Sequence, residues 1–279
     1  MIVVTGATGR LGGVVVEDLL TRVPADRIVA VARDPARASG LADRGVSVRR
    51  GDYDDPDGLP AAFDDAEVLL FVSSPNTEPG VRRRQHLDVV RAAAQARVGR
   101  LVYTSVVNAE RAPGILADHM VTEDAIRETG LAYTILRNTF YMDVFVNPGL
   151  RAAVDAGELR AADGGEAIST ATVTDLGLGA SHVLTSDAHT NQTHDMCGPL
   201  WIFPELAMIL SQEAGRPVEY REIPLAEAGP MAFVYELVRD RFLATTSMEL
   251  ENMLGRPPTG LREAVREALQ VRKGSAQPT

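Results

Sequence analysis

The chain has 279 residues, enough for one large domain or for two smaller ones at ~150 residues each. Its 45% hydrophobic and 24% charged residues are the mixture of an ordinary globular protein, which excludes wholesale disorder. A net charge of −10 argues against nucleic-acid binding, and no apolar run approaches the ~18 residues of a membrane span. The single cysteine, Cys197, excludes an internal disulfide, and no signal peptide is visible, so we expect a cytoplasmic protein.

The first half of the chain alternates short apolar segments with longer helical ones. Buried strands are predicted at Ile2–Thr5, Ile28–Ala32, Val46–Arg49, Val68–Val72, Leu101–Thr104 and Tyr133–Leu136. Helices are predicted at Leu11–Thr21, Pro35–Asp43, Pro56–Phe63, Val81–Ala96 and Asp118–Thr129. Because apolar strands alternate with helices, the predicted fold class is α/β, with a Rossmann-type doubly wound parallel sheet.

The pattern changes after Asn147-Pro148-Gly149. Helices are predicted at Leu150–Ala156, Val173–Val183, Pro204–Ala214, Met231–Ala244 and Gly260–Leu269, and strands at Ile168–Val173 and Val218–Glu222. We therefore expect residues 1–150 to form the Rossmann domain, residues 166–196 to return to it, and residues 197–279 to form a smaller, mostly helical C-terminal cap. The cap is the expected substrate-binding part.

A glycine-rich turn directly follows the first strand and opens the first helix. It reads Gly6-Ala7-Thr8-Gly9-Arg10-Leu11-Gly12, with the spacing G-x-x-G-x-x-G. Glycines allow a sharp turn, a close approach to a pyrophosphate and tight packing of helix on strand, while the helix N-terminus favours the phosphate charge. The turn therefore predicts a dinucleotide site, and a plain glycine turn is the alternative.

The end of the second strand indicates which dinucleotide binds. Arg33 lies about 20 residues beyond Gly12, where an arginine contacts the 2′-phosphate of NADP and an acidic residue contacts the ribose of NAD. Asp34 precedes Pro35, a pattern typical of a helix cap rather than of a ribose ligand. The sequence therefore predicts NADP as cofactor, with NADPH preferred over NADH.

Polar residues also follow the next three strands. Asp52 is placed to accept from the adenine amine with Tyr53 nearby, although a turn leading into a helix explains both residues equally well. The segments Ser73-Ser74-Pro75 and Thr104-Ser105 close two further strands. Ligands of open parallel sheets bind outside the carboxyl ends of the strands, so these segments are expected beside the ribose and nicotinamide. Ordinary loop chemistry is the alternative.

Together these residues resemble the NmrA-like group of atypical short-chain dehydrogenase/reductases, and within it the NADPH:quinone oxidoreductase and triphenylmethane reductase branch. The matching stretches span nearly the whole chain: Thr5–Gly12, Val31–Pro35, Gly51–Pro56, Tyr103–Ser105, His119 with Thr122-Glu123, Tyr133–Asn138 and Gly255–Pro258. The resemblance implies that the glycine turn holds pyrophosphate and that Arg33 holds the 2′-phosphate. It also implies that the nicotinamide is surrounded by Ser73, Ser74, Pro75, Thr104, Ser105, His119 and the segment Arg137–Tyr141.

The chain departs from the wider superfamily in its acid–base residues. Ordinary members use a Tyr-x-x-x-Lys pair, but here no such pair exists, the only lysine is Lys273, and His119 stands roughly where isoflavone-reductase-like relatives place a lysine. Reduction of a simple ketone forms an alkoxide that needs a strong proton donor. A quinone instead gives a phenolate-like anion with a pKa of ~10, and a cationic dye needs no proton. Quinones, conjugated electrophiles and dyes are therefore the expected acceptors.

Three residues are candidates for the catalytic side of the site. His119 is expected to orient the substrate or to donate to the developing oxyanion, with a structural role near its helix as the alternative. Tyr141, with Phe140, is placed to stack on a flat acceptor or to belong to the core. Ser105 completes the set. Arg137 is expected on the cofactor, and Asn138 is expected to donate to the carboxamide or to the acceptor, or to serve in a turn.

Two other patterns are not assigned to a site. His189, His194, Asp195 and Cys197 match no ligand spacing of a metal site, so no metal is expected. The apolar stripe of Phe233, Leu237 and Phe242 is assigned to the core of the cap or to a homodimer face.

The sequence thus predicts an NADPH-dependent reductase that passes hydride to a quinone-like or conjugated aromatic acceptor. The expected partner is a small aromatic or quinone substrate, with neither nucleic acid nor membrane involved. A non-catalytic NADP-sensing regulatory protein of the NmrA type and a tailoring enzyme acting on one aromatic metabolite are the alternatives. Neither the acceptor nor the oligomeric state is predicted.

Overall fold

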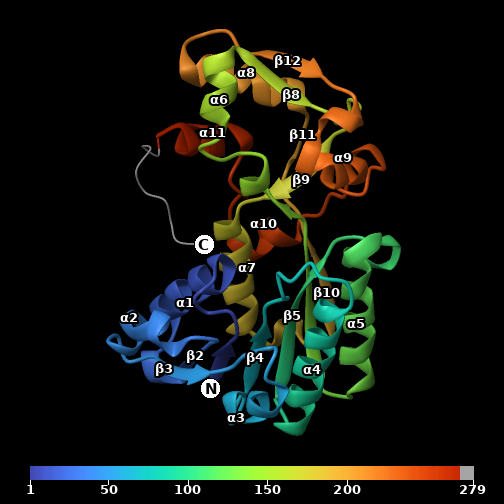
Figure 1. Ribbon diagram of the computed structural model, residues 1–279. Coiled ribbons are helices and arrows are strands. Elements are labelled where there is room, and N and C mark those ends of the chain that lie inside the picture. Colours follow the sequence, from blue (N-terminus) through green and yellow to red (C-terminus); the bar gives the residue numbers. More distant parts are fainter. Residues whose placement is uncertain (271–279) are drawn as a thin grey trace. The chain divides into compact units, whose positions relative to one another are not determined.

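The computed structural model describes residues 1–270 and divides them into two compact units, so Lys273 lies outside the described residues (Figure 1). The first unit consists of Met1–Asn138 and Val173–Met196, and the second of Thr139–Thr172 and, among the described residues, 197–270. The boundary expected near residue 150 therefore falls at residue 138, and the returning segment begins at residue 173 rather than 166. The reason is local: just after Asn138, the strand Phe140–Tyr141 pairs with a strand of the second unit.

A parallel sheet forms the centre of the first unit, with seven strands among the described residues. The strands are β1 (Ile2–Val4), β2 (Ile28–Ala32), β3 (Ser47–Arg50), β4 (Val68–Phe71), β5 (Arg100–Val106), β6 (Ala132–Asn138) and β10 (Gln192–Met196). They pair in the order β10-β6-β5-β4-β1-β2-β3. The chain runs from β1 out to β3 and then restarts with β4 on the other side of β1. The predicted doubly wound sheet is confirmed, and its switch point lies between β1 and β4.

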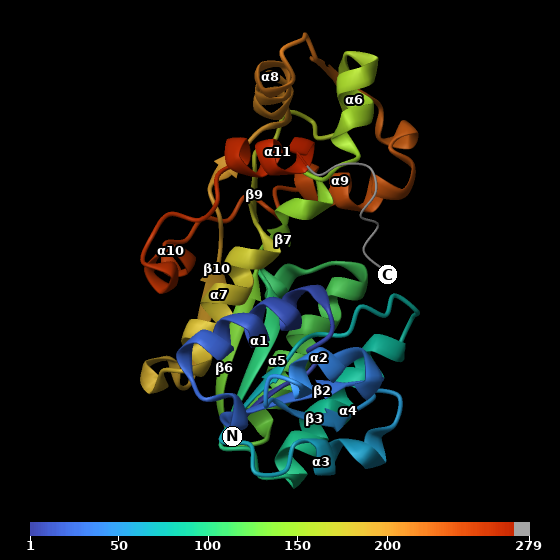
Figure 2. The ribbon, with the colours of Figure 1, turned by 90° about the vertical axis from the view of Figure 1, so that its left-hand side faces the viewer.

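Helices cover both faces of this sheet (Figures 1 and 2). They are α1 (Arg10–Arg22), α2 (Ser39–Ala42), α3 (Leu59–Ala62), α4 (Val81–Gln95), α5 (Asp118–Glu128) and α7 (Val173–Leu184). On one face α1 packs against α7 so closely that a Cβ on Gly177 would lie 2.5 Å from Val14 Cγ1. On the other face, buried side chains of α3, α4 and α5 pack on the strands around Phe71 and Tyr103. The expected helices at 35–43 and 56–63 begin as 3₁₀ turns at Pro35 and Pro56, and only their second halves are α-helical.

The second unit combines helices with two small sheets. Its strands are β7 (Phe140–Tyr141), β8 (Glu158–Ala161), β9 (Ile168–Ala171), β11 (Leu200–Trp201) and β12 (Glu219–Glu222), paired as β11-β9-β7 and β12-β8. Its helices are α6 (Leu150–Ala156), α8 (Phe203–Ala214), α9 (Ala232–Arg239), α10 (Glu249–Leu254) and α11 (Leu261–Gln270). Rings of Phe145, Trp201, Phe203 and Tyr235 contact one another in its core. Phe242 and Leu237 of the predicted stripe are buried, whereas Phe233 is exposed.

The sequence was less informative in this unit. The helix predicted at Met231–Ala244 ends at Arg239, because Arg241 adopts a left-handed φ of 55° and the Phe242 amide bonds back to the Leu237 carbonyl. The short strands β7, β8 and β11 and the helix α10 were not predicted, since segments of two to six residues carry little periodicity. Across residues 1–270, no helix is both long and apolar enough to span a bilayer.

Candidate active site

The glycine turn between β1 and α1 has the backbone geometry that its sequence predicts. Gly6 has a left-handed φ of 60°, which favours glycine. A Cβ on Gly12 would lie 2.3 Å from the Gly6 carbonyl oxygen, so no side chain fits where the helix crosses the turn. Ala7, Leu11 and Gly12 are buried, Thr8 is half-buried, and Gly6, Gly9 and Arg10 are exposed. The turn therefore presents its backbone at the switch point of the sheet.

Helix α1 begins at this turn with Gly9 as its N-cap, and within the described chain no side chain caps it. The Gly9 amide bonds to the Gly6 carbonyl and the Gly13 amide to the Gly9 carbonyl, at 2.8 Å each. No acidic residue occupies the first turn of the helix. Because the N-terminal amides and the helix dipole attract anions, this end of α1 fits the pyrophosphate of a dinucleotide.

At the end of β2, Arg33 and Asp34 differ in what they contact. The Asp34 carboxylate accepts from the Ala36 amide at 3.1 Å and so caps the 3₁₀ turn that starts at Pro35, as the sequence indicated. Arg33 is exposed. The pKa of Asp54 lies below its usual value mainly because of hydrogen bonds from Arg84 and Gln85, with a further contribution from the charge of Arg33. Because Arg33 is exposed and the Asp34 carboxylate already accepts a hydrogen bond from the Ala36 amide, the end of β2 suits a phosphate ligand.

The segment after β3 is largely occupied by bonds within the protein. Asp52 accepts from the Asp54 amide at 3.1 Å, which is the turn role considered as an alternative. The Tyr53 hydroxyl lies 2.6 Å from Thr5 Oγ1 and 2.8 Å from the Val72 carbonyl oxygen. Burial raises the pKa of Tyr53. Tyr53 thus ties the ends of β1 and β4 together at the switch point, a role the sequence did not reveal.

The segment after β4 is fixed by side chains of neighbouring elements. The Ser73 amide donates to Thr104 Oγ1 at 2.9 Å, and the Ser74 amide donates to His86 Nε2 at 2.9 Å. The Ser74 hydroxyl donates to Gln85 Oε1 at 2.5 Å. Ser74 and Thr104 are buried, Ser73 is half-buried and Pro75 is exposed. The structure brings Ser73 and Thr104 together, as predicted, and leaves the Ser73 side chain accessible.

Ser105 and Arg137 meet on a buried carboxylate that the sequence did not single out. Glu123 of α5 has 0% of its side chain exposed and accepts from Ser105 Oγ at 2.6 Å. Arg137 donates to both of its oxygens at 2.9 and 2.8 Å, and Arg127 donates at 3.0 Å. Burial raises the pKa of Glu123, but the bonds from Arg137 and Ser105 outweigh burial and leave the pKa below its usual value. Because an ionised carboxylate only accepts, the Ser105 proton points to Glu123 and away from any ligand.

His119 lies inside the first unit, with only 4% of its surface exposed. Its Nε2 lies 2.5 Å from Arg82 Nη2 and its Nδ1 lies 2.7 Å from the Tyr103 hydroxyl. Since arginine only donates, Nε2 accepts and the neutral ring carries its proton on Nδ1. Burial, Arg82 and His86 hold the pKa of His119 well below its usual value. The geometry therefore corrects the expectation of a proton donor: both ring nitrogens bind protein groups.

His86 belongs to the same hydrogen-bonded network. Its Nε2 accepts from the Ser74 amide, so its Nδ1 carries the proton that reaches Thr122 Oγ1 at 2.9 Å. Burial, aided by the charge of Arg82, lowers the pKa of His86 to about 3. Two neutral histidines and Tyr103 thus connect α4, β5 and α5 beneath the segment that follows β4.

Tyr141 and Phe140 belong to the second unit. They form β7, which pairs in parallel with β9 through Phe140–Thr170 and Tyr141–Ala171, and both are half-buried. Asn138, in contrast, closes β6 in the first unit and is 6% exposed. The structure therefore brings together the predicted residues that follow β1, β2, β4, β5 and β6, because the carboxyl ends of these parallel strands lie at the same end of the sheet. It places Tyr141 in the other unit.

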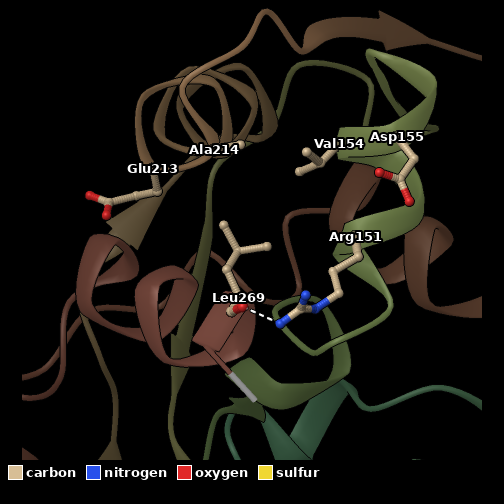
Figure 3. Close-up of a pocket in the computed structure, with 6 residues that line it drawn as sticks. All are labelled: Arg151, Val154, Asp155, Glu213, Ala214 and Leu269. Atoms are coloured by element: carbon tan, nitrogen blue, oxygen red, sulfur yellow. Dashed lines mark hydrogen bonds between the residues drawn. The ribbon is translucent and has the colours of Figure 1, made fainter. Parts of the chain in front are cut away.

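The second unit contains a cavity of about 420 Å³ between α6, α8 and α11 (Figure 3). Its lining residues are Arg151, Val154, Asp155, Glu213, Ala214 and Leu269. Arg151 donates to the Leu269 carbonyl oxygen, and Asp155 pairs with Arg216. Glu213 pairs with Arg262 at 3.0 Å and with Arg266 at 3.2 Å. Because these charged groups already bind protein partners, the cavity wall shows no arrangement for chemistry.

Comparison with known proteins agrees with this geometry. Residues 6–180 match the model of a family described as NAD(P)H-binding, which covers the glycine turn and every strand of the main sheet except β1 and β10. The chain belongs to this NAD(P)H-binding family, in its NmrA-like group, and the resemblance predicted from the sequence is confirmed.

The relatives are reductases of similar length. Triphenylmethane reductase of Citrobacter sp., solved with NADP(H), has 38% identity and a TM-score of 0.93, with 96% of this chain and 99% of that chain covered. The NADPH-dependent quinone oxidoreductase 2 of Escherichia coli, solved with NADPH, has 33% identity and a TM-score of 0.87, with 96% and 99% covered. NAD(P)H azoreductase of Xenophilus azovorans is 32% identical over 82% of this chain and 79% of its own.

Proposed function

We propose that this protein is an NADPH-dependent reductase that transfers hydride to a quinone-like acceptor, a dye or another conjugated aromatic molecule. The observation that carries the proposal is the N-terminus of α1, which no side chain caps in the described chain, at a turn where the left-handed φ of Gly6 favours glycine and where Gly12 leaves no room for a Cβ. That arrangement fits a dinucleotide pyrophosphate. The named activities of its relatives, which are similar over most of this chain, supply the acceptor class.

The fit extends to the other half of the cofactor. Arg33 is exposed at the end of β2 and would hold the 2′-phosphate, while Asp34 is occupied as a cap. Ser73 and Thr104 lie together at the ends of β4 and β5, where they would hold the ribose. When bound, the nicotinamide supplies the hydride, and the protein contributes position and electrostatic stabilisation.

The polar groups near the carboxyl end of the sheet indicate which class of hydride acceptor the protein would reduce. The protons of His119 and Ser105 point to Tyr103 and Glu123, and the hydroxyls of Tyr53 and Tyr103 have raised pKa values through burial. In the described first unit, these groups are therefore poor acids for an alkoxide. A quinone, whose reduced anion is no more basic than tyrosinate, and a cationic dye place no such demand.

A turnover assay tests the proposal against a purely sensing role. The purified chain is mixed with NADPH and a small quinone, or with a triphenylmethane dye, and the absorbance at 340 nm is followed. Steady oxidation of NADPH is expected with either acceptor, and little with an aliphatic ketone. Tight NADP binding without turnover of any acceptor would indicate a regulatory protein instead. We also propose the cytoplasm as its compartment, since a chain with a single cysteine, Cys197, holds no internal disulfide.

A further inference from the structure

One hydroxyl group of the second unit contacts two carboxyl groups. The Tyr220 hydroxyl lies 2.7 Å from Asp163 Oδ1 and 2.5 Å from Glu222 Oε2, and both are distances of O–H···O hydrogen bonds. A phenol has one proton to donate, so it satisfies only one of these two oxygens. The other contact needs a proton on the carboxyl group, because two oxygens without a hydrogen between them repel each other. The geometry therefore requires one proton more than a phenol and two carboxylates carry.

The surroundings of the two carboxyl groups show which of them holds this proton. Asp163 has 0% of its surface exposed, whereas the Glu222 side chain is 40% exposed and lies 3.7 Å from Arg239 Nη1. Burial penalises the ionised form of a carboxyl group, and a nearby cation favours it. Burial accordingly raises the pKa of Asp163, and the charge of Glu222 adds to the rise. The bonds then run in one direction, with Asp163 donating to Tyr220 and Tyr220 donating to Glu222.

Backbone amides hold the remaining oxygens of the two carboxyl groups. The Gly165 amide donates to Asp163 Oδ2 at 3.2 Å, and the Gly164 amide donates to Glu222 Oε1 at 3.1 Å. Residues 163–165 lie in the turn between β8 and β9, whereas Glu222 closes β12. The three side chains of Asp163, Tyr220 and Glu222, called here the acid bridge, therefore join this turn to β12.

Other charged or titratable groups face the acid bridge from the neighbouring elements. From α9, Arg239 donates to the Ala162 carbonyl oxygen at 3.3 Å. Also on α9, burial raises the pKa of Tyr235 to about 12, with contributions from the charges of Asp163 and Glu222. Further charged groups around these elements pair with one another: Arg221 with Glu158, Arg160 with Glu227, and Arg241 with Glu166.

We propose that Asp163, Tyr220 and Glu222 share one extra proton and form a pH-sensitive bridge within the second unit. With the proton in place, every oxygen of the bridge has a partner and the turn after β8 is bonded to β12. Loss of the proton leaves two carboxylates facing a single hydroxyl, so one contact becomes repulsive and the turn is held less firmly. The inference goes beyond the proposed function, because the bridge requires neither a nucleotide nor an acceptor.

The expected pH dependence has a definite sign. An aspartate in the unfolded chain loses its proton near pH ~4. Folded Asp163 keeps its proton to a higher pH, so between these two pKa values the folded chain binds more protons than the unfolded one. The stabilising contribution is fully present below pH ~4 and is lost as pH rises through the folded pKa, by up to about tenfold in the folding equilibrium constant per pH unit.

Infrared spectroscopy of the full chain tests the extra proton directly, because the carbonyl stretch of a protonated carboxyl group is separate from the bands of a carboxylate. Exposed carboxyl groups are ionised at about pH 6, where the wild-type protein should still show the band of one protonated group. Asp163→Asn should remove this band and keep the fold, because its amide donates to Tyr220 as the protonated acid does. Glu222→Gln should remove it as well, since its amide donates to Tyr220 and leaves the hydroxyl proton for an ionised Asp163.

Asp155→Asn and Glu158→Gln are matched controls in the same unit. Their side chains are 73% and 34% exposed and pair with Arg216 and Arg221, so both variants should keep the band. Chemical denaturation should show that Asp163→Asn lacks the loss of stability expected above pH ~4.

Three results would overturn the acid bridge. The first is a wild-type spectrum without a protonated carboxyl band at about pH 6. The second is a band that survives in Asp163→Asn, which would place the proton elsewhere, or in Glu222→Gln, which would show that burial alone protonates Asp163. The third is an Asp163→Asn variant whose stability follows pH as that of the wild type does. None of these results bears on nucleotide binding or turnover, so the proposed function is tested separately.

Discussion

The two halves of the candidate site differ in what their polar groups contact. Around β1 and β2, the functional groups are backbone amides at an uncapped helix end and the exposed Arg33. Around β4, β5 and β6, polar side chains are buried and bind one another, as in the Glu123 and His119 networks. The first half fits a negatively charged ligand. The second half is held in place by its internal hydrogen bonds, and its groups are poor proton donors. Position and charge, rather than proton donation, are therefore what this site offers.

The largest effect is expected at the glycine turn. In Gly12→Ala the new Cβ would lie 2.3 Å from the Gly6 carbonyl oxygen, so the turn must move. The backbone amides at the start of α1 would then no longer point at the pyrophosphate. NADP⁺ affinity measured by calorimetry should fall on the order of a thousandfold. Gly13→Ala is the control, because its new Cβ would lie 3.7 Å from its nearest neighbour, the Ala7 carbonyl oxygen, which is an ordinary van der Waals contact. Equal affinity in the two variants would remove the argument that close packing shapes this site.

The buried network is expected to matter for stability. Glu123→Gln removes the charge that Arg137 and Arg127 share, and breaking a buried ion pair should lower the free energy of unfolding by about 3 kcal/mol. Chemical denaturation followed by circular dichroism measures this change. The same substitution at Glu110, whose side chain is 57% exposed, should cost less than about 1 kcal/mol. A loss at Glu110 as large as at Glu123 would contradict the assignment of the buried pair.

Acidification should act on the histidines of the same half. Burial holds the pKa of His119 well below its usual value and that of His86 at about 3, so the unfolded chain binds more protons than the folded one below about pH 6.5. Their stabilising contribution is present above that pH and is lost as pH falls, by about 1.4 kcal/mol per pH unit for each histidine. In His119→Gln, the slope between pH 6.5 and 5 should be smaller by that amount, with no change of slope above pH 7. An unchanged slope between pH 6.5 and 5 would show that His119 is accessible to protons in the folded state.

The smallest effect concerns the choice between the two dinucleotides. Arg33→Ala removes an exposed charge at the end of β2 and should weaken NADPH about tenfold while leaving NADH nearly unchanged. Fluorescence titration with both nucleotides measures the ratio. Arg37→Ala, at an exposed arginine in the following 3₁₀ turn, serves as the control. Equal weakening of NADPH and NADH in Arg33→Ala would place the 2′-phosphate elsewhere.

The sequence predicted the features that depend on neighbouring residues. The strands of the main sheet up to β6 and the helices α1, α4 and α5 lie within a few residues of their predicted bounds, because apolar runs and helical periodicity are local. The glycine turn was predicted equally well, since the left-handed φ of Gly6 favours glycine and a Cβ on Gly12 would collide with the Gly6 carbonyl. Asp34 was correctly assigned to a cap from the proline that follows it.

Roles that depend on distant partners were not readable. His119 is surrounded by Arg82 and His86 of α4 and Tyr103 of β5, and nothing in its own segment indicates that both ring nitrogens are occupied. Glu123 appeared only within a matching stretch, although it collects three hydrogen-bond donors from α5, β5 and β6. The second unit was hardest, because its strands are short and their partners lie far along the chain.

The single tryptophan of the chain, Trp201, is buried in the second unit and donates to Thr170 Oγ1 at 2.8 Å. Its emission consequently reports the melting of that unit alone, whereas the fluorescence of a bound reduced nucleotide would report the first. Recording both signals during one denaturation would reveal whether the two parts of this molecule unfold as a single cooperative body or in separate steps.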